Sequence, residues 1–142
     1  MSRALYNREI LRLAASIPHL RRLEDPHGSA ERRSAVCGSA VAIDVRMGED
    51  GRIAALGQDV KACALGQAAA ALMAGHAEGR SAADLAVARD ALRAWLAGEQ
   101  DDPGEWPGLS VFSEARAYPA RHASILLPFE TAAEAAERAG KV

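Results

Sequence analysis

The chain has 142 residues, 49% of them apolar, and its 17 basic and 19 acidic side chains leave a net charge of −2. A chain of this length is expected to form one domain, residues 1–142, with a core that needs no disulfide or metal. No run of about 18 apolar residues is present to span a bilayer, and the balanced charge argues against nucleic-acid binding. Two cysteines are too few for a secreted disulfide scaffold. These bounds predict a cytoplasmic protein without nucleic-acid or membrane partners.

The N-terminal segment predicts one helix followed by a loop. Residues 2–16 place apolar side chains at helical intervals and arginines on the opposite face. Pro18 ends this helix, because proline cannot donate to the backbone ladder and restricts the residue before it. The stretch 24–34 is polar and contains proline, glycine and serine, which predicts a loop.

The next segment changes to the period of a β-strand. In residues 40–47, Val41, Ile43 and Val45 alternate with smaller or charged residues, which predicts a half-buried strand. The sequence Gly-Glu-Asp-Gly at 48–51 is typical of a hairpin turn. A weaker return strand is expected over 53–62.

Helices are expected after the hairpin. Residues 64–77 are rich in alanine and have nearly no polar face, so this helix should be buried. Ser81 is a good N-cap for a second helix over 82–97, which carries one apolar stripe.

The C-terminal part begins with an acidic segment. Residues 99–114 hold five acids and no base, which we interpret as a solvated surface, and 101–108 form a linker with two prolines and two glycines. A short helix from Leu109 and a longer one near 120–139 follow, and Pro128 is expected to kink or divide the latter. The element order predicts an α+β fold: an N-terminal helix, a small antiparallel sheet of about three strands, then helices on one face.

Two cysteines carry the most informative pattern. Cys37 precedes Gly38 at the start of the first predicted strand, and Cys63 follows the return strand. The hairpin should therefore bring both thiols to one end of the sheet. Cys63 also begins a helix, where the dipole favours thiolate, and two thiolates suit zinc, iron or an iron–sulfur cluster. The alternative is that the cysteines are small buried apolar residues, since a pair without C-x-x-C spacing is a weak motif.

Several segments in this order resemble a known family. They are Cys37-Gly38, Val60-Lys61-Ala62-Cys63-Ala64-Leu65-Gly66-Gln67-Ala68, Gly79-Arg80-Ser81 and Tyr118-Pro119-Ala120-Arg121-His122-Ala123-Ser124-Ile125-Leu126-Leu127. Together they resemble the U-type iron–sulfur cluster assembly scaffolds, the NifU-like N-terminal domain, over essentially the whole chain.

The resemblance implies a site of three cysteines and an aspartate that holds a nascent cluster, or zinc in its place. Cys37 and Cys63 match the first two cysteines, and Ser39 stands where the family has aspartate. Aligning on the arginine of an Arg-x-x-Cys form places Ser124 at the third cysteine position. Aligning on the histidine of a His-Cys-Ser-Ile-Leu form places Ala123 there. No thiolate is supplied in either alignment, and the family's Leu-Pro-Pro-Val-Lys stretch is absent.

The resulting hypothesis is a non-enzymatic scaffold-like protein. Cys37, Cys63 and His122 would bind iron, zinc or a labile iron–sulfur cluster, with Ser39 or Ser124 as weak ligands at family positions. By resemblance, its partners are a cysteine desulfurase or other cluster-assembly proteins. A second hypothesis is an interaction or regulatory module that keeps the fold without a cluster. A third is a reversible disulfide between the two cysteines.

Overall fold

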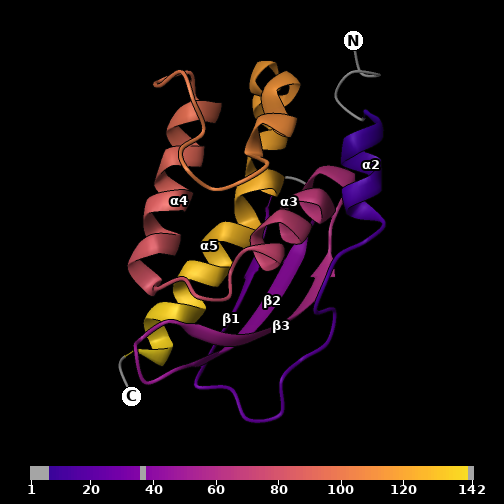
Figure 1. Cartoon of the computed structure of the whole chain (residues 1–142). Helices are drawn as coiled ribbons and strands as arrows, with labels where there is room; N and C mark the ends of the chain where they lie inside the picture. The colour runs from indigo at the N-terminus through magenta and orange to yellow at the C-terminus, as the bar shows by residue number, and fades with distance from the viewer. Residues whose placement is uncertain (1–6, 36–37, 141–142) are drawn as a thin grey trace.

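A computed structural model describes residues 7–35 and 38–140 of the chain (Figure 1). The predicted α+β class is confirmed: one helix precedes a three-stranded antiparallel sheet, and helices follow it. The elements in chain order are α2 (Arg8–Ala14), β1 (Gly28–Arg33), β2 (Ala40–Met47), β3 (Ile53–Lys61), α3 (Ala64–Gly75), α4 (Ala82–Leu96), the 3₁₀ helices η1 (Leu109–Ala117) and η2 (Pro119–Arg121), and α5 (His122–Ala139).

The N-terminal helix α2 begins at an asparagine cap and packs on α3. The Asn7 side chain accepts a hydrogen bond from the Ile10 N–H at 2.9 Å, which satisfies one of the free donors of the first turn. Ile10 is fully buried against the core, and the helix ends before Pro18 as predicted.

The sheet has the order β1-β2-β3, and the predicted hairpin joins β2 to β3. The Gly51 N–H donates to the Gly48 carbonyl at 3.0 Å and closes the turn. The predicted loop over 24–34 is wrong for Gly28–Arg33, which forms the edge strand β1. Only Gly28 and Ala30 of this strand are buried, so the sequence carries no alternating apolar pattern to reveal it.

The central strand β2 is buried on both faces, which corrects the expectation of a half-buried strand. Val41, Ile43 and Val45 face the helices and are fully buried. On the opposite face Asp44 is also buried, because the segment preceding β1 crosses the sheet there. The Leu23 N–H donates to Asp44 Oδ2 at 2.9 Å, and the Arg22 guanidinium binds both carboxylate oxygens.

The helices form a layer on one face of the sheet, with α3 and α5 nearest to it, α4 beyond α5 and α2 beside α3 (Figure 1). Helix α3 is buried along most of its length, as predicted, and α4 begins with a capping box between Ser81 and Asp84. Pro128 does not divide α5, which runs unbroken from His122 to Ala139.

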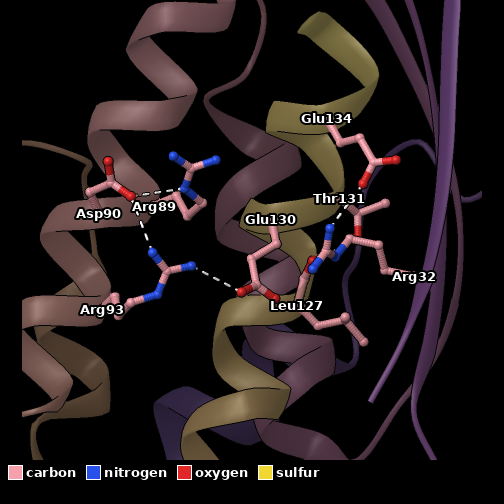
Figure 2. A network of polar contacts seen from close by, with 8 residues as sticks. All are labelled: Arg32, Arg89, Asp90, Arg93, Leu127, Glu130, Thr131 and Glu134. Carbon is pink, nitrogen blue, oxygen red and sulfur yellow. Dashed lines mark hydrogen bonds and ion pairs between the residues drawn. The ribbon is translucent and has the colours of Figure 1, made fainter. Parts of the chain in front are cut away.

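Ion pairs join the outer edges of this layer (Figure 2). Arg93 of α4 binds Glu130 of α5 at 3.1 Å, and Arg32 of β1 binds Glu134 of α5 at 2.9 Å. The fold therefore connects α5 to both neighbours by charged contacts as well as apolar ones. Within residues 7–35 and 38–140, no helix is long and apolar enough to cross a membrane.

Candidate metal centre

The predicted ligand positions that the structure describes lie just before β2 and at the starts of α3 and α5. Ala40 at the start of β2 pairs with Lys61 at the end of β3, so the residues just outside this pair lie at one edge. Ser39 is buried there, and its carbonyl accepts the Ser34 N–H at 2.8 Å. Gly38 has a φ of 72°, a conformation that favours glycine.

Cys63 caps the N-terminus of α3, as predicted from sequence. Its backbone is extended, its carbonyl accepts the Gln67 N–H at 2.9 Å, and its side chain makes no capping hydrogen bond. The thiol is half-buried and free. The unpaired N–H groups of the first turn of α3 lie at this end of the helix, so Cys63 presents its thiol at a helix N-terminus.

A close approach of α3 to α5 brings Ser124 toward the same end. A Cβ placed on Gly66 would lie 2.8 Å from the Ala62 Cβ and 3.3 Å from the Ser124 carbonyl oxygen. Glycine at position 66 therefore avoids a clash with Ala62 and lets the start of α3 lie close to Ser124 of α5. Ser124 is 1% exposed, whereas Ala123 is half-buried.

His122 begins α5 and is held by a backbone group. Its Nε2 lies 2.9 Å from the Ala115 carbonyl oxygen at the end of η1. A carbonyl can only accept, so Nε2 carries a proton and donates it, which leaves Nδ1 as the ring nitrogen that could bind a metal. Histidines that bind metals usually donate their other ring N–H to a carbonyl or carboxylate in this way. The arrangement therefore suits a ligand that binds through Nδ1.

The predicted ligand set is described only in part. Cys37 lies outside the described residues, so its role and its pairing with Cys63 remain predictions. The described part of the chain, without residues 36 and 37, contains no cluster of three histidine, cysteine or acidic side chains that could hold a metal. The donors it does provide here are the Cys63 thiol, the His122 imidazole and the hydroxyls of Ser39 and Ser124. Thiolate and imidazole suit zinc and iron, whereas hydroxyls are weak ligands for either metal.

Sequence reasoning missed two supports of this end of the molecule. The first is the Ala115 carbonyl that orients His122, which no side-chain pattern could reveal because the acceptor is backbone. The second is the depth at which Ser124 is buried. The structure shows Ser124 of α5 next to Gly66 of α3.

Comparison with known proteins agrees with this arrangement. No protein-family model and no curated protein sequence matches the chain. The solved structure of the N-terminal part of a nitrogen-fixing NifU-like protein from Brucella abortus has a TM-score of 0.90 and is 34% identical, covering 97% of this chain and 96% of that one.

Two more distant structures show the fold alone. A protein from Fervidobacterium islandicum AW-1, assigned as an iron–sulfur cluster assembly scaffold for the SUF system, has a TM-score of 0.86 at 20% identity, covering 96% of this chain and 99% of that one. A hypothetical protein has a TM-score of 0.80 at 16% identity, covering 94% and 97%. On the identity and coverage of the Brucella structure, the chain belongs to the U-type iron–sulfur cluster assembly scaffold family, as a NifU-like N-terminal domain.

Proposed function

We propose that the protein is a scaffold that binds iron, zinc or a labile iron–sulfur cluster through Cys37, Cys63 and His122. The observation that supports this best is the state of His122, whose Nε2–H donates to the Ala115 carbonyl and leaves Nδ1 available. Cys63 adds a thiol at a helix N-terminus. Ser39 and Ser124 would contribute at most weak fourth ligands.

The chain's own residues define what such a scaffold does. Cys63 would bind the metal as a thiolate, and its proton would be released on binding. His122 is held in one tautomer and supplies a neutral ligand. A cysteine desulfurase or another cluster-assembly protein would deliver sulfur in the cytoplasm, and the cargo would pass to an acceptor. The chain would hold its cargo and pass it on without converting a substrate, so we propose that the protein is not an enzyme.

A second candidate is an interaction or regulatory module that keeps the fold but holds no cluster. It is favoured by the composition of the site, because the family pattern has three cysteines and this chain has two. Both family alignments leave a residue without a thiol at the third position.

Anaerobic purification followed by assays of bound metal and sulfide separates the two candidates. We expect stoichiometric metal that is lost in Cys63→Ala and weakened in His122→Ala. His76→Ala is the matched control, because His76 is an exposed histidine at the other end of α3. Metal-free protein that still binds a cysteine desulfurase would favour the second candidate over the first.

A third thiol can be restored at either alignment position. Ser124→Cys should raise metal retention more than Ala123→Cys, because the Ser124 Cβ lies in the seam between α3 and α5 where Gly66 packs. Chelator challenge of the zinc-loaded variants measures this order. A larger gain in metal retention from Ala123→Cys would show that position 123, and not position 124, faces the metal.

A further inference from the structure

An apolar hollow lies away from the predicted metal centre, between α4 and the linker 101–108. Its volume is about 240 Å³. Apolar surface comes from α4 and from the Trp106 ring, and Val87 stands in it with 69% of its surface exposed. Only Leu11 and Leu20 are comparably exposed among the large apolar residues in the described part of the chain. The full lining is Arg80, Asp84, Val87, Ala88, Ala91, Gly104, Glu105 and Trp106.

The walls of the hollow are fixed by specific contacts. Gly104 has a φ of 96°, and a Cβ there would lie 2.8 Å from the Ala91 Cβ, so glycine lets the linker lie directly on α4. Gln100 donates to the Ala91 carbonyl at 3.2 Å and to the Asp102 carbonyl at 2.9 Å. Trp106 donates to the Leu72 carbonyl at 3.0 Å. The linker is therefore an ordered wall, although its composition predicts only a solvated segment.

Arg80, a basic residue that lines the hollow, makes a cation–π contact with Trp106. The Arg80 guanidinium lies 4.6 Å from the centre of the Trp106 ring, and its Nε donates to the His76 carbonyl at 3.3 Å. Arg80 is thus committed to contacts within the chain. Within the described part of the chain it makes no ion pair with the acids of the linker.

Those acids have no partners of their own. The side chains of Glu99, Asp101, Glu105 and Glu114 make no hydrogen bond or ion pair with any residue of the described structure, and Asp102 caps only the Gly104 N–H. Several acids of α4 and α5 are paired with arginine, as in Arg93–Glu130 and Arg32–Glu134. The acids at 99, 101 and 105 instead leave unpaired negative charge beside the apolar hollow, one lining residue of which is Glu105.

We propose that this hollow docks a basic segment of a partner protein, which inserts one apolar side chain against Val87 and places arginines or lysines on the acids of 99–105. Charge complementarity identifies the class of partner, because the rim repels nucleic acids and anionic lipid surfaces. The apolar floor supplies the anchor, since interfaces draw most of their affinity from a buried apolar or aromatic contact at their centre. This surface is independent of the predicted metal ligands.

Fluorescence anisotropy with a short synthetic peptide tests the proposal. The peptide carries arginines around a single leucine, and two control peptides replace either the leucine by serine or the arginines by glutamate. We expect binding only by the first peptide, with affinity falling as salt rises. Val87→Ser should weaken it by about tenfold, because the apolar contact is lost. Asp101→Lys and Glu105→Lys should each weaken it by about threefold, the scale of rim charges.

Glu49→Lys is the matched charge control, because Glu49 is an exposed acid in the β2–β3 turn that makes no side-chain contact with the described residues. It should leave peptide affinity unchanged. Equal binding of the serine peptide, or an unchanged affinity in Val87→Ser, would overturn the proposal. Self-association that disappears in Val87→Ser, measured by sedimentation, would assign the hollow to a second copy and overturn it equally. All variants should keep the metal content of the parent protein, so this test and that of the metal centre fail separately.

Discussion

The buried carboxylate of Asp44 should contribute a large, pH-dependent part of the stability. Its side chain is 2% exposed in the middle of β2. Arg22 donates to it from Nε at 2.7 Å and from Nη2 at 2.8 Å, Ser29 Oγ donates at 2.6 Å, and the Leu23 N–H donates at 2.9 Å. These groups hold the segment before β1 against the outer face of the sheet. Asp44→Asn removes the charge and keeps the shape.

The size of this contribution to the unfolding free energy follows from the lowered pKa of Asp44. Hydrogen bonding to Arg22, with further help from Ser29 and Leu23, lowers the pKa of Asp44 from 3.8 to about 2. At about 1.4 kcal/mol per unit, this shift corresponds to about 2 kcal/mol of unfolding free energy. Because the folded pKa is the lower one, the contribution is complete above pH 3.8. It is lost as the pH falls through 2.

Urea unfolding followed by circular dichroism at several pH values between 7 and 2 measures this contribution. The parent protein should exceed Asp44→Asn by about 2 kcal/mol at pH 7, and the difference should shrink toward pH 2. Asp59→Asn is the control on the same sheet, since Asp59 is exposed and should change stability by less than about 0.5 kcal/mol. A difference between the parent and Asp44→Asn that is the same at pH 7 and pH 2 would refute the assignment of the stability to this carboxylate.

Three further substitutions test the packing and capping contacts by the same urea assay. Gly66→Ala should cost about 1–3 kcal/mol because its Cβ would press on Ala62 and on α5, and it should also lower metal retention; Gly75→Ala in the same helix has open space and should cost nothing comparable. Ser81→Ala removes the capping box of α4 and should cost about 1 kcal/mol, whereas an unchanged midpoint would show that the cap is unimportant. Arg93→Gln breaks the pair with Glu130 and should cost at most about 1 kcal/mol, a loss that high salt should abolish.

Local patterns in the sequence predict much of the fold. The alternation over β2, the Gly-Glu-Asp-Gly turn and the Ser81 cap each concern neighbouring residues, and the structure confirms the strand, the turn and the cap, although β2 is buried on both faces. β1 escapes prediction because an edge strand with exposed charges needs no apolar alternation. Asp44 escapes it because its partner Arg22 lies 22 residues away in a segment that has no regular structure.

In the candidate site, too, the sequence predicts features that depend on neighbouring residues and misses those that depend on distant ones. The position of Cys63 at a helix start follows from the change of period after β3, and the structure confirms it. The environment of His122 does not follow, because it depends on where η1 leaves the Ala115 carbonyl. The choice between Ala123 and Ser124 also needs three dimensions, since neighbouring helical residues differ by about 100° in direction.

The charge of the proposed site bears on how firmly it would hold its cargo. Three thiolates and a carboxylate, the family pattern, carry four negative charges and leave two after binding one divalent metal. In the proposed site, metal-bound thiolates of Cys37 and Cys63 would carry two, and His122, which donates from Nε2 to the Ala115 carbonyl, would bind as an uncharged ligand through Nδ1. A divalent metal there would give a site with no net charge and an open position. Weaker attraction and an open coordination position both ease ligand exchange. Serine at position 39, and serine or alanine at the family's third cysteine position, would therefore favour transfer of the cargo over its retention. On this reasoning Ser39→Asp, which restores a family charge, should slow the release of zinc to a chelator.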